Sequence, residues 1–227
     1  MRHQKKSMSV KIKICGMTNG EDALAGLRAG ADYIGMVFYP KSPRYVSPER
    51  AEHIVQLVQG QGFPDARFIG VFVNEPPKKA AGLVERLGLF AAQIHGDEPE
   101  EYFEHLGSCR FIRTIRVKSE ECLSALGRGR AAWAWLCDAY SEQYGGAGKK
   151  IDAAMLAPYV SRHRIFLAGG LTPENISDAL KQIKPYGVDV SSGVEIAPGK
   201  KSHEKIMAFI KSVKEADNGA KNKNTTS

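Results

Sequence analysis

Hydrophobic and polar positions alternate with a period of two over short stretches of the chain, and each such stretch is followed by an amphipathic one. The first is Lys11–Cys15, where Ile12 and Ile14 point to one side of a predicted strand and the residues between them to the other. Gly16 ends this strand, and a helix is predicted over Gly20–Ala29. A cysteine therefore stands at the carboxyl end of a strand, the edge at which strand–helix folds collect ligands and catalytic groups.

The same strand-then-helix pattern recurs along the chain. Further strands are predicted over Ala31–Phe38, Ala66–Val73, Leu89–His95, Arg110–Val117, Ala132–Asp138, Ile165–Ala168 and Gly187–Val190. Further helices are predicted over Glu49–Gln59, Pro77–Leu87, Pro99–Leu106, Glu120–Leu126, Asp152–Tyr159, Glu174–Ile183 and Ser202–Glu215. Eight strands, each followed by a helix, predict an α/β fold, a single (β/α)₈ TIM barrel over residues 10–215. A doubly wound sheet is the alternative, but it gathers ligands at one crevice, whereas polar and glycine-rich residues here follow most of the strands.

The composition narrows the class of protein. The chain has 227 residues, of which 43% are hydrophobic and 25% charged, as in ordinary soluble domains. Its apolar runs fall far short of the roughly 20 residues of a membrane helix, and the basic start has no apolar stretch behind it. We therefore expect neither a membrane span nor a signal peptide. The four cysteines are scattered without a CxxC pair, which argues against a zinc site or a disulfide framework and favours the cytoplasm.

The net charge of +7 gathers at the two ends of the chain. Residues 1–13 carry +5 and residues 211–227 carry +2, so residues 14–210 are neutral. A protein that binds nucleic acid through phosphate contacts needs a basic face on its folded body. We therefore predict a flexible basic segment over residues 1–9 and a disordered polar tail over residues 216–227.

Two side chains at the ends of predicted strands suit acid–base chemistry. Cys15 shares a strand face with Lys13, whose ammonium would favour the thiolate, so Cys15 is a candidate general base; the alternative is a small buried hydrophobe. Inside a barrel Lys13 needs a carboxylate partner, for which Asp189 on the eighth strand is the candidate. Asp138 ends the sixth strand beneath a glycine-rich loop over residues 139–150. Asp138 is a candidate general acid, because closure of that loop would remove water and raise the pKa of its carboxyl group. The alternative is that Asp138 is a helix cap or a turn residue.

Polar groups after other predicted strands suit a phosphorylated, acidic ligand. Gly169-Gly170 follows the seventh strand and Ser191-Ser192-Gly193 the eighth, where barrels of this class bind phosphate through backbone N–H groups and hydroxyls; plain turns are the alternative. Arg44, in the loop after the second strand, would clamp a substrate carboxylate unless it is a solvated surface residue. Gln93 and His95 alternate inward on the fourth strand, where His95 is either a satisfied core histidine or a polar group lining the site.

Seven motifs resemble those of the phosphoribosylanthranilate isomerase family. They are, in order, KICGMT with Cys15, FYPKSPRYV with Arg44, QIHGDE with Gln93 and His95, LCDA with Asp138, YGGAGK, LAGGLTPENI and DVSSGVE, and the match runs from about Lys11 to Lys211. The resemblance implies a step of tryptophan biosynthesis, the Amadori rearrangement of N-(5-phosphoribosyl)anthranilate to 1-(2-carboxyphenylamino)-1-deoxyribulose 5-phosphate. It also implies that Cys15 is the general base, Asp138 the general acid and Arg44 the group that holds the anthranilate carboxylate. No cofactor or metal is expected, because the substrate nitrogen, once an iminium, is its own electron sink.

Two other functions are compatible with parts of the pattern. A histidine-pathway isomerase of a phosphoribosyl aminoimidazole would use a similar barrel, but it would need two aspartate acid–base groups and a second glycine-serine cradle. The loop over residues 74–77 offers no such cradle. A basic nucleic-acid-binding protein would use the charged ends. We expect instead a small phosphorylated substrate, no nucleic-acid or membrane partner, and either a monomer or a homodimer.

Overall fold

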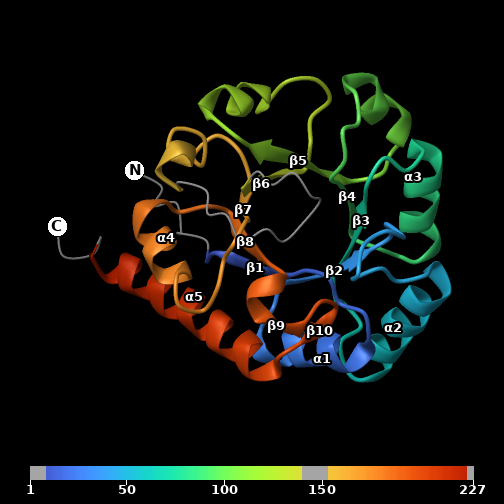
Figure 1. Cartoon of the computed structure of the whole chain (residues 1–227), viewed down its shortest axis with the longest axis horizontal. Coiled ribbons are helices and arrows are strands. Elements are labelled where there is room, and N and C mark those ends of the chain that lie inside the picture. The colour runs from blue at the N-terminus through green and yellow to red at the C-terminus, as the bar shows by residue number, and fades with distance from the viewer. Residues whose placement is uncertain (1–8, 140–152, 224–227) are drawn as a thin grey trace, which may run out of the picture.

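Eight parallel strands close into a barrel in the computed structural model, which describes residues 9–139 and 153–223 (Figure 1). The strands are β1 (Lys11–Ile14), β2 (Tyr33–Val37), β3 (Phe68–Phe72), β4 (Ala91–Ile94), β5 (Phe111–Val117), β6 (Ala134–Ala139), β7 (Ile165–Leu167) and β8 (Gly187–Val190). Each strand pairs with the next in chain order, and β8 pairs with β1. The predicted (β/α)₈ barrel is confirmed, and the doubly wound alternative is wrong. Because all strands are parallel, their carboxyl ends meet at one rim.

A ring of helical segments covers the outside of the barrel (Figure 1). The α-helices are α1 (Gly20–Ala29), α2 (Pro48–Gly60), α3 (Pro77–Arg86), α4 (Ile176–Gln182) and α5 (His203–Lys223). The first two begin at side-chain caps, since Asn19 and Ser47 accept hydrogen bonds from backbone N–H groups of the first turn. These caps fix where the chain turns from the rim into each helix.

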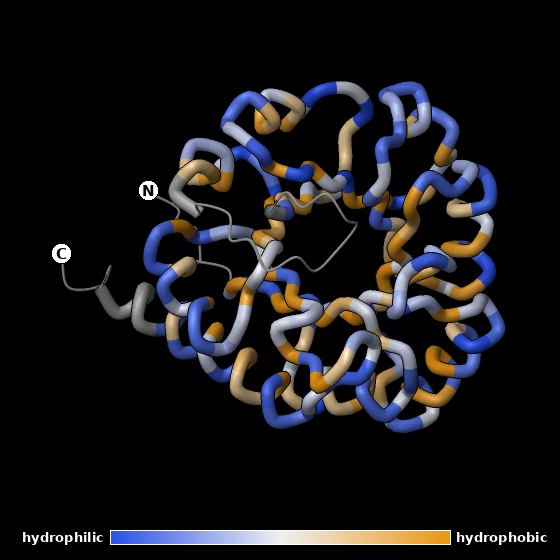
Figure 2. The backbone as a smooth tube through the Cα atoms, viewed as in Figure 1, coloured by the Kyte–Doolittle hydropathy of each residue, from blue (hydrophilic) through white to orange (hydrophobic). Residues whose placement is uncertain are grey.

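Period-two alternation divides the strand side chains between two apolar cores. Ile12 and Ile14 belong to the core between the strands and the helices. Tyr33, Ile69 and Phe166 belong to a second cluster that fills the barrel interior. In Figure 2 hydrophilic residues mark much of the outer ring of helices, and hydrophobic residues recur along the strands. The interior of the barrel is therefore a packed core rather than a pore.

Three of the predicted helices are short 3₁₀ segments instead. They are η1 (Glu100–Leu106), η2 (Glu120–Ala125) and η3 (Ala153–Leu156). They are seven, six and four residues long. Nucleating an α-helix is costly and is repaid by length, whereas 3₁₀ turns suit short connections.

The end of the chain differs from the prediction in two ways. Helix α5 continues to Lys223, past the predicted boundary at Glu215, so residues 216–223 are helical rather than part of a disordered tail. Ala216 packs against the main core, which explains why the helix extends. A small antiparallel hairpin, β9 (Glu195–Ala197) and β10 (Lys200–Lys201), was also not predicted, and it follows the 3₁₀ turn η4 (Ser192–Val194).

Some predictions concern residues outside those described. They include the basic segment over residues 1–8, the glycine-rich loop from residue 140 to residue 150, and residues 224–227. Across residues 9–139 and 153–223, no helix combines the length and the apolar character that a membrane span requires.

Candidate active site

A cavity opens at the rim where the strands end. Nine of the predicted site residues line it: Cys15, Arg44, Gln93, His95, Asp138, Gly169, Gly170, Ser191 and Ser192. The other lining residues are Val37, Tyr39, Ser42, Val71, Val73, Ala168, Leu171, Asp189 and Val190. Residues from most of the strands and their following loops therefore meet at one cavity, as the barrel topology predicts.

Cys15 follows β1 directly and lies in the cavity wall with 8% of its surface exposed. A Cβ atom added to Gly35 of β2 would lie 2.8 Å from the Cys15 Sγ and 3.1 Å from the Lys13 Nζ. Only a glycine at this position leaves room for the thiol and the ammonium group. Burial raises the pKa of the Cys15 thiol above its ordinary value, and the neighbouring Lys13 lowers it by less.

Lys13 and Asp189 form a buried ion pair inside the barrel. They are register partners on the adjacent strands β1 and β8, and the Lys13 Nζ donates to the Asp189 Oδ1 at 2.9 Å. The Lys13 side chain is fully buried and that of Asp189 is 9% exposed. Burial lowers the pKa of Lys13, but Asp189 and Cys15 raise it by more, so Lys13 keeps its charge beside the thiol. The predicted pairing of these two residues is confirmed.

Replacing Lys13 with methionine should destabilise the fold by about 3–5 kcal/mol, because the Asp189 carboxylate would be left buried without its partner. Lys11→Met is the matched control. Lys11 also forms an ion pair, with Asp32, but its side chain is 29% exposed and its loss should cost at most about 1 kcal/mol. Urea-induced unfolding of both variants measures the difference, and equal small losses would contradict a buried pair.

His95 lies beside the carboxyl group of Asp138, and Gln93 contacts the opposite side of the His95 ring. The Gln93 Nε2, which can only donate, lies 3.1 Å from the His95 Nδ1, and the Thr114 hydroxyl lies 3.2 Å from the same atom. The Nδ1 atom therefore accepts, and the ring carries its proton on Nε2, which lies 3.7 Å from the Asp138 Oδ2. Burial, together with Lys13 and Arg116, lowers the pKa of His95 to about 4, so the ring is neutral at pH 7.

This neutral histidine makes the fold sensitive to acid. The unfolded chain binds a proton at His95 below pH about 6.5, whereas the folded protein does so only below about 4, so stability falls as the pH drops between these values. The loss should approach about 3 kcal/mol at pH 4. His95→Gln should remove this part of the loss in urea unfolding measured at pH 7 and pH 4.5. Substitution of the exposed His53 should not, and an unchanged loss in His95→Gln would contradict the assignment.

Arg44 reaches the cavity from the loop after β2, as predicted, but it already has an ionic partner. Its Nε donates to the Glu195 Oε1 at 2.8 Å and its Nη2 to the Glu195 Oε2 at 2.7 Å. The Arg44 side chain is 13% exposed, so it is not a solvated surface residue. Glu195 was not among the site residues predicted from the sequence.

The loops after β7 and β8 form the remaining wall of the cavity. Gly169 and Gly170 have φ angles of +92° and +61°, a left-handed turn that glycine adopts without strain. Gly193 is the one predicted site residue that does not line the cavity. A Cβ atom there would lie 1.9 Å from the carbonyl oxygen of Leu171, so this glycine lets the two loops pack together.

A family model described as N-(5'-phosphoribosyl)anthranilate isomerase matches residues 12–212. The chain belongs to the phosphoribosylanthranilate isomerase family. A member of this family from Trichlorobacter lovleyi is 44% identical over 209 residues, which cover 91% of this chain and 99% of the relative. The family resemblance inferred from the seven motifs is thereby confirmed.

Solved structures of phosphoribosylanthranilate isomerases agree with the fold. The crystal structure of the enzyme from Thermotoga maritima has a TM-score of 0.82 and 42% identity, and the match covers 91% of this chain and 99% of that one. Another crystal structure of the family was determined in complex with reduced 1-(o-carboxyphenylamino)-1-deoxyribulose 5-phosphate. It has a TM-score of 0.79 and 40% identity over the same shares of the two chains.

Three residues at or behind the cavity wall were missed in the sequence. Gly35 looks like an ordinary strand glycine, and only the barrel shows that it faces Cys15. Glu195 and Lys201 belong to the hairpin β9–β10, which is too short to give a periodic signal. The Pro198-Gly199 pair between the two charged residues was the available sign of a tight turn.

Proposed function

We propose that this protein catalyses the Amadori rearrangement of N-(5-phosphoribosyl)anthranilate to 1-(2-carboxyphenylamino)-1-deoxyribulose 5-phosphate, a step of tryptophan biosynthesis. The observation that carries the proposal is the set of functional groups that line one cavity. It holds the Cys15 thiol, the Asp138 carboxyl group, the Arg44 guanidinium and the loops that follow β7 and β8. The names of the relatives support the same reaction.

In this proposal the two ends of the substrate define its orientation. The phosphate binds at the loops that carry Gly169, Gly170, Ser191 and Ser192, through backbone N–H groups and hydroxyls. The anthranilate carboxylate binds at Arg44, which approaches the cavity from the loop after β2. The ribose then lies between them, within reach of β1 and β6.

Asp138 is the proposed general acid for opening the sugar ring. Its carboxyl group, in the protonated form, gives its proton to the furanose ring oxygen as the C1–O bond breaks, and the substrate nitrogen becomes the iminium nitrogen of a Schiff base. The His95 ring beside it is neutral at pH 7, because burial lowers its pKa to about 4. A neutral ring places no positive charge against a carboxyl group that must hold a proton.

Cys15 is the proposed general base. As a thiolate it removes the proton from C2, and the electron pair of the C–H bond moves toward the iminium nitrogen to give an enolamine. The enolamine then takes up a proton at C1 and loses the proton of its C2 hydroxyl, which gives the ketone. The Lys13 ammonium group lowers the pKa of the thiol, against the effect of burial. Lys13 itself stays charged through its bond to Asp189.

We further propose that the reaction needs no cofactor, since the iminium nitrogen accepts the electron pair that leaves C2. The protein would act in the cytoplasm, where the four free thiols would stay reduced. Its partner would be the small phosphorylated substrate rather than nucleic acid or a membrane. The two ends of the substrate can be held within one chain, so a monomer and a homodimer would both be active.

An anthranilate-fluorescence assay with freshly generated N-(5-phosphoribosyl)anthranilate tests the proposed function. We expect turnover of this substrate and none of a phosphoribosyl aminoimidazole, and turnover of the second alone would favour the histidine-pathway reaction. Removing residues 1–8 and 224–227 should leave the activity unchanged. A nucleic-acid-binding protein would instead show salt-sensitive binding that this trimming weakens, because it removes Arg2, Lys5 and Lys6.

A further inference from the structure

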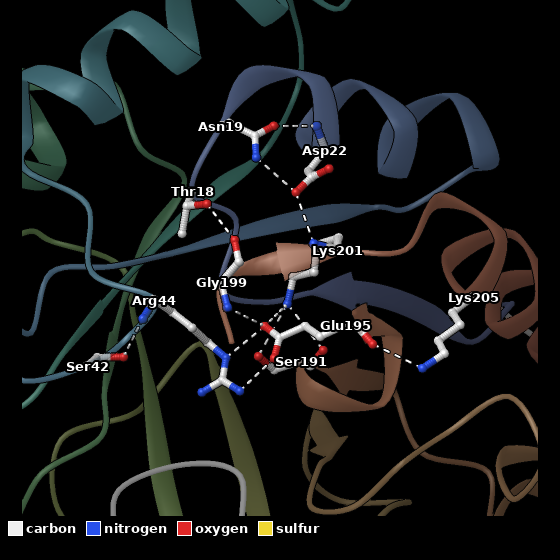
Figure 3. Close-up of polar contacts among 10 residues, drawn as sticks. All are labelled: Thr18, Asn19, Asp22, Ser42, Arg44, Ser191, Glu195, Gly199, Lys201 and Lys205. Atoms are coloured by element: carbon white, nitrogen blue, oxygen red, sulfur yellow. Dashed lines mark hydrogen bonds and ion pairs between the residues drawn. The ribbon is translucent and has the colours of Figure 1, made fainter. Parts of the chain in front are cut away.

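The guanidinium group of Arg44 is held in a fork by one buried carboxylate. Glu195 accepts from two nitrogens of Arg44 at 2.8 and 2.7 Å, the bidentate geometry that fixes the plane of a guanidinium group (Figure 3). The Glu195 side chain is 4% exposed and does not line the cavity. Glu195 therefore lies behind the wall of the cavity, and Arg44 forms part of that wall.

A buried ammonium group holds Glu195 in turn. The Lys201 Nζ donates to the Glu195 Oε1 at 2.8 Å and to the backbone oxygen of Ser191 at 3.2 Å, and the Lys201 side chain is fully buried. The backbone N–H of Gly199 also donates to the Glu195 Oε1, at 3.3 Å. Burial raises the pKa of Glu195, but Arg44 and Lys201 lower it by more, so Glu195 is an anion.

The hairpin that supplies Glu195 and Lys201 is hydrogen-bonded to the loop after β1 and to the first turn of α1. The Thr18 hydroxyl donates to the carbonyl oxygen of Gly199 at 2.6 Å. The Asp22 Oδ2 accepts from the backbone N–H of Lys201 at 3.1 Å and from the Asn19 side chain at 2.9 Å (Figure 3). These bonds join the hairpin to the segment that follows Cys15, the proposed general base.

Gly16, in the loop after β1, leaves the space that the Arg44 side chain occupies. Gly16 has a φ angle of +77°, and a Cβ atom on it would lie 2.5 Å from the Arg44 Cδ and 3.0 Å from the Ser191 Oγ. The Arg44 stem therefore runs across the backbone that follows Cys15. Its path is set by Gly16 on one side and by Glu195 on the other.

We infer that Glu195 and Lys201 are positioning residues that aim Arg44 at the carboxylate of the substrate and keep the charge there positive. The inference rests on the proposed function. Arg44 and Glu195 alone are a neutral pair, and a carboxylate that joined them would leave a net negative charge in a poorly solvated place. Burial lowers the pKa of Lys201, and its contact with Glu195 acts in the opposite direction and favours the ammonium form. With Lys201 protonated, the three groups carry one net positive charge, which the substrate carboxylate neutralises.

The test compares two substrates that differ only in the carboxylate: N-(5-phosphoribosyl)anthranilate and N-(5-phosphoribosyl)aniline. Glu195→Gln keeps the shape of the side chain but removes its charge and one of its acceptors. We expect kcat/KM for the anthranilate substrate to fall by about tenfold or more, mainly through KM, while the aniline substrate is affected little. Lys201→Met should act in the same direction, and Arg44→Ala should abolish the preference between the two substrates.

Two controls separate positioning from damage to the fold. Lys205→Met removes a donor to the backbone oxygen of Glu195 but not to its carboxylate, and it should leave both substrates unaffected. Glu195→Asp keeps the charge and should restore part of the preference that Glu195→Gln loses. Equal losses on both substrates in Glu195→Gln and Lys201→Met would overturn the inference, because a structural defect does not depend on the substrate carboxylate.

Failure of the proposed function would give a different result from failure of the inference about Glu195 and Lys201. If the wild-type protein turned over neither substrate, that function would be wrong whatever the variants did. Calorimetric binding of the reduced product analogue, with and without its carboxyl group, would then decide the inference. Positioning predicts that Glu195→Gln weakens binding of the carboxylated compound alone, and equal weakening of both compounds would overturn it.

Discussion

Replacing Cys15 with alanine should lower kcat by about 10²- to 10⁴-fold, the usual contribution of a positioned general base. The thiol of Cys15 is the base that we place at C2 of the substrate, and alanine offers no proton acceptor there. The wild-type rate should rise with pH in the alkaline range, because the base must be deprotonated and burial raises its pKa. Cys15→Ala should lose this dependence. Anthranilate fluorescence followed from pH 6.5 to pH 9.5 measures both effects.

A second buried cysteine offers a matched control. Cys137 lies on β6, but its side chain belongs to the core between the strands and the helices rather than to the cavity. Burial raises the pKa of this thiol to about 12, so it remains protonated at neutral pH. Cys137→Ala should leave turnover nearly unchanged. Wild-type activity in Cys15→Ala, or an equal loss in Cys137→Ala, would refute the role of Cys15.

Asp138→Asn should also lower kcat by about 10²- to 10⁴-fold. The amide has nearly the shape of the carboxyl group but has no acidic proton to give to the ring oxygen, so the sugar opens slowly. Binding of the reduced product analogue, measured by calorimetry, should change little, because the ligand phosphate and carboxylate are bound elsewhere in the cavity. Asp32→Asn is the control, since Asp32 pairs with Lys11 away from the cavity. Equal turnover in Asp138→Asn and the wild type would remove Asp138 from the mechanism.

The sequence predicted the site to the extent that local periodicity and strand order determine it. Alternation along β1 and β8, together with barrel closure, was enough to pair Lys13 with Asp189, although 176 residues separate them. The same logic brought Cys15 and Asp138 to one cavity. Both predictions rest on a period of two, which short strands already display.

The parts that the sequence did not predict depend on contacts without a period. Glu195 stands in a three-residue strand, and its partner Arg44 lies 151 residues away. Nothing in the spacing of these residues indicates that one carboxylate meets both Arg44 and Lys201. The extension of α5 likewise depends on the packing of Ala216 against the core. The polar composition of the residues that follow Ala216 gives no indication of this packing.

Deuterium at C2 of the substrate tests most directly whether Cys15 and Asp138 serve different steps. Cys15→Ser retains a weak base, so removal of the C2 proton should limit its rate, and the deuterated substrate should react several-fold more slowly. In Asp138→Asn ring opening should limit the rate, and deuterium at C2 should have almost no effect. A large isotope effect in Asp138→Asn together with none in Cys15→Ser would contradict the assignment of base to the sulfur and acid to the carboxyl group.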